Sequence, residues 1–199
     1  MNPQQTGLAY DKITHLWQRD SFDRTNGIAQ HKRALAFAKN RGNALDIGCG
    51  CTGRFIDLLI EENFTPVGID VSVEMIRLAK QRHPNVPFYC QDICELEAVE
   101  QYDFVTAWDS IWHVPLNEQR QVMTRIVRSL KPQGIFIFSF GGLDKEGEHQ
   151  NTAMGPEVYY STLGTNGYLS LLIELSCVIR RLEHGQASDT HTYIIVEKL

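Results

Sequence analysis

The chain has 199 residues, of which 43% are hydrophobic and 22% charged, and its net charge is −5. These values are ordinary for a soluble globular protein and predict a single domain large enough to bury a core. The negative charge argues against a dedicated nucleic-acid binder, because neutralising phosphates requires a basic surface. No apolar stretch is long enough to cross a bilayer and the amino terminus is polar, so a cytoplasmic protein is expected.

The predicted elements alternate between helices and strands along the first half of the chain. Residues 10–17 and, with a clearer amphipathic pattern, residues 28–39 predict two helices. A strand is predicted over residues 43–47, a helix over 53–62 and a second strand over 65–70. Ser72 has the side chain of an N-cap, and the apolar spacing after it predicts another helix.

The second half continues this order and then departs from it. Strands are predicted over residues 87–90, 103–108 and 134–140, with a helix capped by Asn117 before the last of them. Residues 141–158 contain glycines and acids and predict a long loop, and residues 141–165 are a candidate substrate lid. A helix capped by Asn166 follows, then strands over 178–184 and 190–197 joined by residues 185–189. Right-handed crossovers should make most strands parallel and buried on both faces.

The most informative segment is the end of the first predicted strand, which runs through a carboxylate into glycines. Gly48, Gly50 and Gly53 fit the turn in which a strand passes to a helix and a nucleotide-like ligand lies against bare backbone. Side chains at Gly48 or Gly50 are expected to occupy the space of the ligand, and glycine adopts the φ angles that the turn needs. Asp70 ends the next strand about 20 residues later, where an acid can bind ribose hydroxyls.

Asp46 separates two classes of protein that share this turn. In a dehydrogenase, the pyrophosphate needs the amide-rich start of the helix and would be repelled by a buried acid just before the glycines. An amino group would be favoured at the same place, two residues before Gly48. The sequence therefore predicts a cationic, amine-bearing ligand, with a dehydrogenase as a lower-ranked alternative.

At these residues the chain resembles the class I S-adenosylmethionine-dependent methyltransferase superfamily. Five segments keep the order and spacing of that family's motifs, at residues 45–50, 68–72, 91–93, 102–108 and 130–136. The resemblance implies an α/β, Rossmann-like fold with helices on both faces of a seven-stranded, mostly parallel sheet. It also implies that strand 7 is antiparallel and lies between strands 5 and 6. By the same resemblance the chain is one methyltransferase domain over residues 1–199, with cap helices in residues 1–40.

The implied cofactor is S-adenosyl-L-methionine, with S-adenosyl-L-homocysteine as its product. By the resemblance, Asp70 holds the ribose, Asp92 hydrogen-bonds the adenine amino group and Ile93 covers the face of the adenine. The expected cofactor residues are Asp46, Gly48, Cys49, Gly50, Asp70, Val71, Met75, Asp92, Ile93 and Trp108. A binding role is favoured for the three acids, because a buried charge is costly without a partner.

The implied reaction is methyl transfer, in which the protein aligns a nucleophile with an electrophilic methyl group and excludes water. His113 is the candidate general base or substrate contact, because histidine titrates near neutrality, and a backbone-bonded structural histidine is the alternative. Asp109 is the second catalytic candidate, as the partner of a cationic substrate group or as a helix N-cap. The candidates for the substrate pocket or lid are Tyr10, Trp17, Trp112, Tyr159 and Tyr160.

No metal is expected from the five cysteines. The Cys49/Cys51 and Cys90/Cys94 pairs end at the same edge of the predicted sheet, but neither has the spacing typical of zinc ligands. Their odd number and the lack of secretory features also argue against a disulfide framework, so reduced thiols near the pocket are expected. The other histidines show no ligand spacing and are assigned to surface or structural positions.

A small-molecule methyl acceptor is the preferred interpretation, because almost no sequence is left for an accessory domain. One alternative is a sensor or partner subunit that binds S-adenosylmethionine without transferring its methyl group. Another is methylation of RNA or protein, which the acidic charge and the Ala-Trp-Asp-Ser sequence after the fourth strand disfavour, since no Asn-Pro-Pro-Tyr-type motif is present there. The acceptor, the methylated atom and the oligomeric state stay open.

Overall fold

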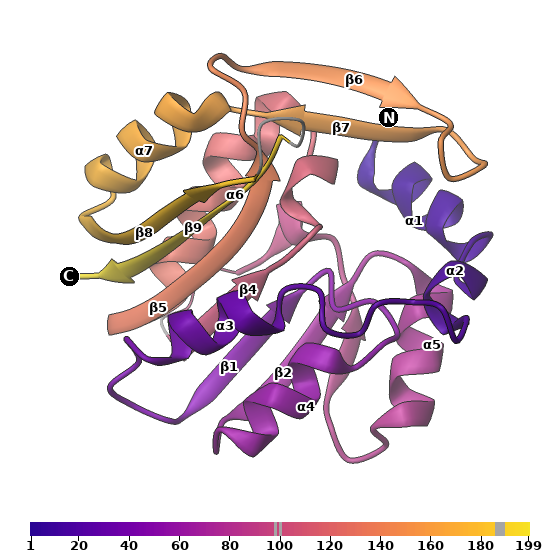
Figure 1. Cartoon of the computed structure of the whole chain (residues 1–199), viewed down its shortest axis with the longest axis horizontal. Helices are drawn as coiled ribbons and strands as arrows, with labels where there is room; N and C mark the ends of the chain where they lie inside the picture. Colours follow the sequence, from indigo (N-terminus) through magenta and orange to yellow (C-terminus); the bar gives the residue numbers. More distant parts are fainter. Residues whose placement is uncertain (98, 100, 186–189) are drawn as a thin grey trace.

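A seven-stranded sheet runs through the molecule, with helices on both of its faces (Figure 1). The computed structural model describes residues 1–97, 99, 101–185 and 190–199. The strand order is β3-β2-β1-β4-β5-β9-β8. The parallel strands are β1 (Asn43–Ile47), β2 (Thr65–Asp70), β3 (Phe88–Cys90), β4 (Tyr102–Ala107) and β5 (Leu130–Gly141). The last two, β8 (Cys177–His184) and β9 (His191–Lys198), pair antiparallel, and β9 lies between β5 and β8. The expected Rossmann-like sheet is confirmed, including the antiparallel strand 7.

Two layers of core lie on opposite faces of this sheet, because successive side chains of a strand point to opposite sides. One layer packs against α3 (Ile28–Leu35) and α4 (Arg54–Glu61), with α5 (Val73–Arg82) next to α4. The other packs against α6 (Leu116–Ser129) and α7 (Gly164–Glu174). Phe104 enters the first layer and Val105 the second, and both are fully buried. This double burial explains why the parallel strands are continuous apolar runs.

Three further elements stand at the end of the sheet where the parallel strands finish. They are α1 (Pro3–Asp11), the short α2 (His15–Gln18), and a hairpin of β6 (Gly147–Asn151) and β7 (Val158–Thr162). Figure 1 shows the hairpin crossing above this end with α1 beside it, and α1 contacts β7. Two single turns of 3₁₀ helix, η1 (Ile93–Glu95) and η2 (Ile111–His113), follow β3 and β4. These elements enclose the ends of the strands.

The helix expected over residues 10–17 is wrong: those residues hold the end of α1 and most of α2, and α1 begins at Pro3. The sequence carried a stronger signal upstream. Asn2 and Gln5 form a capping box, and proline is favoured at the first position of a helix. The predicted bounds of β1 and β2 match the structure, and the N-cap role of Ser72 is confirmed by its bond from the Met75 amide.

Two predicted caps and one predicted loop are wrong. Asn117 and Asn166 lie inside the first turns of α6 and α7, whose N-cap positions are Pro115 and Leu163. Residues 141–158 hold β6, which is polar throughout and therefore gives no apolar alternation to read. Part of the expected connection 185–189, residues 186–189, lies outside the described residues.

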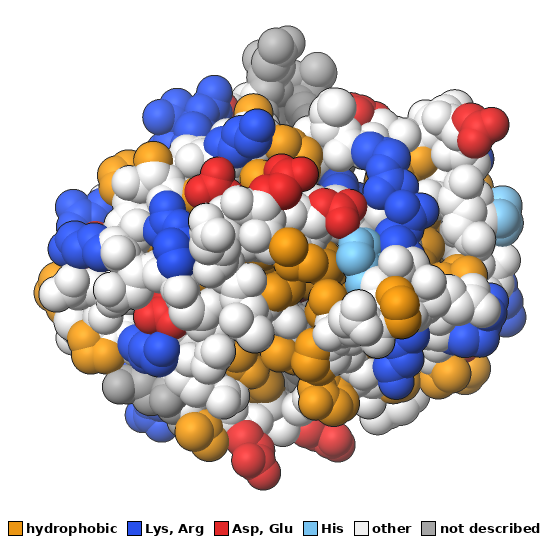
Figure 2. Space-filling view, turned by 90° about the horizontal axis from the view of Figure 1, so that it is seen from below, with side chains coloured by type: hydrophobic (Ala, Val, Ile, Leu, Met, Phe, Trp, Pro, Cys, Tyr) orange, Lys and Arg blue, Asp and Glu red, His pale blue; other side chains and the backbone are white. Residues whose placement is uncertain are grey.

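The surface shown in Figure 2 has no single continuous basic patch, because acidic side chains lie among the lysines and arginines. Hydrophobic side chains gather near the middle of that face. None of the helices in the described part of the chain is both long and apolar enough to cross a membrane.

Candidate functional site

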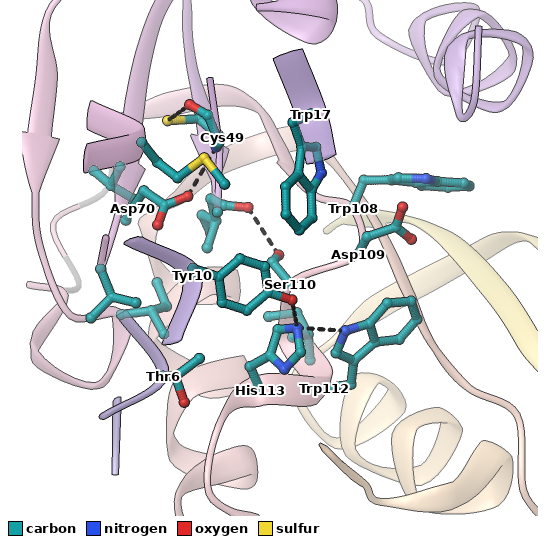
Figure 3. Close-up of a pocket in the computed structure, with 18 of the residues that line it drawn as sticks. Thr6, Tyr10, Trp17, Cys49, Asp70, Trp108, Asp109, Ser110, Trp112 and His113 are labelled. Atoms are coloured by element: carbon teal, nitrogen blue, oxygen red, sulfur yellow. Dashed lines mark hydrogen bonds between the residues drawn. The ribbon is translucent and has the colours of Figure 1, made fainter. Parts of the chain in front are cut away.

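A cavity of about 370 Å³ lies at the carboxyl ends of β1, β2 and β4. This is where ligands bind in open α/β sheets, because the strand order reverses there and the loops diverge. Its wall combines the glycine-rich turn after β1, the end of β2, the segments after β3 and β4, the inner side of α1 and α2, and the hairpin turn. Figure 3 shows side chains from these elements converging on one space.

The glycine-rich turn is held against the end of β2 by backbone bonds. The amides of Gly48 and Cys49 donate to the carbonyl of Ile69, at 2.8 and 3.0 Å. Gly48 has φ +67°, and a Cβ there would lie 2.3 Å from the Cβ of Ser110. A side chain at Gly48 would therefore meet Ser110, which lines the cavity with it, and the expectation that it would fill ligand space stays a prediction.

Gly50 behaves differently from Gly48. It has φ +55°, and a Cβ built there meets no atom within 4 Å, so this glycine leaves an open cradle on the cavity wall. Its amide donates to Oδ2 of Asp70 at 2.9 Å, which holds the turn and the acid in one unit. The amide of Ser72 donates to Oδ1 of the same carboxylate, also at 2.9 Å.

Asp70 lines the cavity, and burial raises the pKa of its carboxyl while these amide bonds oppose the rise. The backbone amides of Gly50, Ser72 and Val71 all act on this carboxylate, which orients it at the end of β2. A carboxylate on the cavity wall can accept the hydroxyls of a ribose. The expected role of Asp70 thus fits the geometry and stays a prediction.

Asp46 is 2% exposed and is not among the side chains that line the cavity. Burial raises the pKa of its carboxyl to about 7, and the positive charge of Arg54 opposes this shift. Among the described residues, no donor hydrogen-bonds this carboxyl. Asp46 therefore stands behind the cavity wall, and its expected role as the partner of an ammonium group stays a prediction.

The other expected cofactor residues surround the same space. Oδ1 of Asp92 accepts the amide of Cys94 at 2.8 Å, which caps η1 and leaves the second carboxylate oxygen without that bond. Burial raises the pKa of the Cys49 thiol well above its usual value, so this cysteine is a neutral thiol. The cavity is also lined by Val71, Met75, Ile93 and Trp108.

Trp108 packs in the core and also lines the cavity. It is 4% exposed, packs on the rings of His31 and Tyr193, and donates from Nε1 to Oδ1 of Asn26 at 3.4 Å. His31 is fully buried between the Gly27 carbonyl and the Thr106 hydroxyl, which is the structural role expected for it. Trp108 is therefore a fixed wall of the cavity.

Aromatic side chains from four elements line the end of the cavity away from Asp70 (Figure 3). The ring of Tyr10 lies 5.4 Å from that of Trp17 and 5.2 Å from that of His113. Tyr160 lies 5.0 Å from His113 and 6.4 Å from Trp112. Four of the five expected substrate or lid residues thus meet in one aromatic cluster.

Tyr159 is the exception, and its expected place in the pocket is wrong. Successive residues of a strand point to opposite sides, so only one of the two tyrosines on β7 can face the cavity. The hydroxyl of Tyr159 donates to Glu148 and accepts the amide of Leu116 at 3.0 Å. The hydrogen bonds of Tyr159 thus connect the hairpin to the start of α6.

His113 is held in one tautomer. Nδ1 lies 2.8 Å from the carbonyl oxygen of Tyr159, which can only accept, so Nδ1 carries the proton. Nε2 accepts the indole N–H of Trp112 at 3.0 Å and lies 2.6 Å from the hydroxyl of Tyr10. Burial lowers the pKa of His113 to about 4, so the expectation of titration near neutrality is wrong, and the backbone bond given as the alternative is present.

Asp109 is held by partners from several elements, with φ +56°. Its Oδ1 lies 2.8 Å from Nε2 of His191 and accepts the Ser139 hydroxyl at 3.2 Å. Its Oδ2 accepts Nδ2 of Asn26 at 3.3 Å and lies 3.9 Å from Arg54. The alternative of a helix N-cap is wrong, because Ser110 occupies that position before η2. With these partners, the Asp109 carboxylate is a fixed part of the cavity wall.

Two ionisable side chains of the cavity wall, Arg54 and His191, were not predicted from sequence. Arg54 lies in the first turn of α4, where its charge opposes the helix dipole, and its side chain is only 10% exposed. This unfavourable position of a positive charge could have indicated in advance that Arg54 has a partner at the site. His191 lies on β9, 82 residues beyond Asp109 in the chain, and no spacing rule could have linked the two.

Within the described residues, no group of three or more histidines, cysteines or acids could hold a metal ion. Cys49, Cys51 and Cys177 are buried and Cys90 is exposed, and all five cysteines are free thiols.

Comparisons with known proteins agree with this geometry. Residues 44–134 match the family described as methyltransferase domain. A relative from Geobacillus sp. strain WCH70, assigned to the methyltransferases, is 30% identical over 135 residues, covering 65% of this chain and 53% of its own. The ubiquinone biosynthesis O-methyltransferase of Salmonella paratyphi A is 27% identical over 149 residues, covering 71% and 51%.

Among solved structures, the PH0226 protein of Pyrococcus horikoshii OT3 superposes with a TM-score of 0.71 at 27% identity. The superposition covers 88% of this chain and 90% of that one. By contrast, this chain spans about half the length of the two relatives found by sequence.

Proposed function

We propose that this chain is a class I S-adenosylmethionine-dependent methyltransferase that methylates a small-molecule acceptor, which the match of residues 44–134 and the likeness to PH0226 support. The cofactor of this family is S-adenosyl-L-methionine. The observation that carries the proposal is the arrangement around Gly50. The open backbone at Gly50 is bonded to the Asp70 carboxylate at the end of β2, and the buried acid Asp46 stands in β1, two residues before the glycine-rich turn begins.

The carboxylate acceptors of the site suit each end of the cofactor. Asp70 would accept the ribose hydroxyls, and the carboxylate of Asp92 would accept the adenine amino group, while Ile93 and Met75 provide apolar surface. Asp46 would balance the ammonium group. When bound, S-adenosylmethionine supplies an electrophilic methyl group on a sulfonium. The chain then has to orient a nucleophile and exclude water, which the aromatic cluster over the cavity does.

The size and closure of the site support a small acceptor. The cavity of about 370 Å³ lies at the lower end of the 300–1,000 Å³ that is typical of ligand sites. Helix α1 and the hairpin both stand over it. The Salmonella relative is an O-methyltransferase of ubiquinone biosynthesis, which is the synthesis of a small molecule. A protein or RNA segment would have to displace α1 to reach the same space.

Calorimetric titration with S-adenosylmethionine and S-adenosylhomocysteine tests the cofactor site. Micromolar binding, about −8 kcal/mol, is expected for the wild type. Asp70→Ala should abolish it, and Asp20→Ala, an exposed acid outside the cavity, should leave it unchanged. Formation of S-adenosylhomocysteine from a mixed pool of metabolites then tests transfer. Tight binding without product from any acceptor class would favour a sensor that does not transfer methyl groups, and binding of NADH instead would favour a dehydrogenase.

A further inference from the structure

The hydroxyl of Tyr10 points away from the cofactor end of the cavity and toward His113 and Trp112 (Figure 3). It lies 2.6 Å from Nε2 of His113. Because Nδ1 of that ring is bound to a backbone carbonyl, Nε2 presents its lone pair to the Tyr10 hydroxyl and the Trp112 indole. Tyr10 therefore connects the open space to a buried base.

Two donors compete for this one lone pair. The indole N–H of Trp112 can only donate, and it reaches Nε2 at 3.0 Å. The Tyr10 hydroxyl reaches the same atom, so its proton shares an acceptor that is already engaged. The oxygen of Tyr10 has no other hydrogen bond among those described, and it can accept a bond from a ligand while its own proton faces the imidazole.

The position of Tyr10 is fixed by the anchoring of α1. Oδ1 of Asp11 accepts the Ser72 hydroxyl at 2.5 Å and the Glu74 amide at 3.0 Å, which ties the end of α1 to the start of α5. A Cβ at Gly7 would lie 2.6 Å from the carbonyl oxygen of Val71, so α1 packs directly on the β2–α5 turn. Tyr10 is thus held between the cofactor end and the aromatic end.

The residues around Tyr10 and His113 favour an uncharged methyl acceptor. Tyr160 and Asp109 are the ionisable groups that face His113 from β7 and from the segment after β4, and Asp70 acts on Tyr10 from β2. Asp109 is already bonded to His191, Ser139 and Asn26. The rings of Trp17, Trp112 and Tyr160 supply flat apolar surface that suits a planar molecule.

We propose that Tyr10 takes the proton of an un-ionised hydroxyl on a planar, uncharged acceptor and passes its own proton to Nε2 of His113. This rests on the methyltransferase function proposed above. Tyr10 contacts the acceptor, and His113 acts through Tyr10 as a positioning residue.

The step balances in atoms and charge. The acceptor's O–H bond breaks as its oxygen bonds to the methyl carbon, and the sulfur–methyl bond breaks with its electron pair left on sulfur. The acceptor proton goes to the Tyr10 oxygen, and the Tyr10 proton goes to Nε2. His113 leaves the step as an imidazolium and later loses this proton to solvent. A hydroxyl becomes a strong acid as its oxygen is methylated, so a base with a pKa of about 4 is strong enough.

Probe binding tests the contact without any turnover. The protein saturated with S-adenosylhomocysteine is titrated with 2-naphthol and with 2-methoxynaphthalene, a pair that differs only in the free hydroxyl. We expect the wild type to prefer 2-naphthol by about five-fold, the value of one ordinary hydrogen bond. Tyr10→Phe should lose this preference. Tyr89→Phe, which removes an exposed hydroxyl outside the cavity, should keep it.

Turnover separates proton transfer from simple positioning. His113→Gln keeps an oxygen that can accept a bond from Tyr10 but cannot take up a proton. We expect kcat on hydroxylated acceptors to fall about 100-fold in Tyr10→Phe and also in His113→Gln, with the affinity for S-adenosylhomocysteine unchanged. Nitrogen-15 shifts of His113 should show an unprotonated Nε2 from pH 5 to 8, and Trp112→Phe should raise its pKa by removing the competing donor.

Three results would overturn the proposal. They are equal binding of the two naphthalenes, full kcat in His113→Gln, and a protonated Nε2 at neutral pH. Absence of binding by either naphthalene to a protein that still binds S-adenosylhomocysteine would also count against it, because it removes the planar acceptor. Loss of cofactor binding itself would instead overturn the proposed function, so the two failures are distinguishable.

Discussion

Burial shifts two ionisable side chains near the cavity toward their uncharged forms. It raises the pKa of Asp46 to about 7 and lowers that of His113 to about 4. Both shifts have the same physical origin, because a low-dielectric environment penalises whichever form is charged. A cationic ligand near Asp46 would favour the ionised form of that carboxyl and would not affect His113 in the same way. The charge of the free site therefore depends on pH more than that of the occupied site.

Binding of S-adenosylmethionine should therefore tighten as the pH rises from 6 to 7.5. The ligand's ammonium group favours ionised Asp46, whose pKa of about 7 in the free protein leaves it mostly protonated at pH 6. The expected gain in affinity is roughly eight-fold, with release of up to one proton. Calorimetry in buffers of different ionisation enthalpy measures both. Asp46→Asn should bind at least ten-fold more weakly and show no such dependence, and a pH-independent wild type would rule out this role for Asp46.

Gly48 and Gly50 should respond differently to alanine. Gly48→Ala places a Cβ 2.3 Å from the Cβ of Ser110 at positive φ, and unfolding by urea should show a loss of about 3 kcal/mol. Gly50→Ala meets no atom within 4 Å, so only about 1 kcal/mol of backbone strain is expected, together with a large loss of cofactor binding. Gly147→Ala, which also meets no atom and has no positive φ, is the matched control. Equal effects at 48 and 50 would contradict this distinction.

At the level of elements, the anchoring of α1 depends on one carboxylate. Asp11→Ala removes the acceptor of the Ser72 hydroxyl and the Glu74 amide at the start of α5. We expect the free energy of unfolding to fall by about 1 kcal/mol, the usual cost of losing a helix-end acceptor. Limited proteolysis between α1 and α3 should become faster, and Asp20→Ala should show neither change. Unchanged proteolysis in Asp11→Ala would mean that packing at Gly7 holds α1 alone.

Elements with a local signal were predicted well from sequence. The apolar runs of β1 and β2 and the N-cap at Ser72 were found with their bounds, because burial on both faces and capping are written in neighbouring residues. Hairpin strand β6 was missed, since its polar residues become a strand only by pairing with β7. The caps predicted at Asn117 and Asn166 lie two and three residues after the N-cap positions, because element boundaries are the least certain part of a prediction from sequence.

The residues of the candidate site also differ in how far they could be predicted from sequence. Gly50 and Asp70 follow from a motif whose spacing reflects backbone geometry, and both line the cavity. The charge state of His113 depends on burial by Tyr10, 103 residues away in the chain, and no local pattern encodes it. The hydrogen bond between Asp109 and His191 also joins residues that are far apart in the sequence. Residue types near a strand end are predictable, but their protonation and partners are properties of the assembled fold.

For the whole molecule, ligand binding should raise the thermal stability. S-adenosylhomocysteine at 100 times its Kd adds about 2.7 kcal/mol if it binds only the folded state. For a chain of this size that corresponds to a rise in Tm of about 5–10 °C by calorimetric scan. Asp70→Ala should show no rise with the ligand, and NADH should produce none in the wild type. A rise in Asp70→Ala equal to that of the wild type would move the binding site elsewhere.

The position of β9 has a consequence for how the chain is made. On a ribosome, β5 emerges about 50 residues before β9, the strand that completes its hydrogen bonding on one side. At 5–20 residues per second, the nascent chain carries an open, hydrophobic strand edge for roughly three to ten seconds. Such an edge can pair with another chain on the same polysome. Chaperones that act during translation would therefore protect this interval more than any later one.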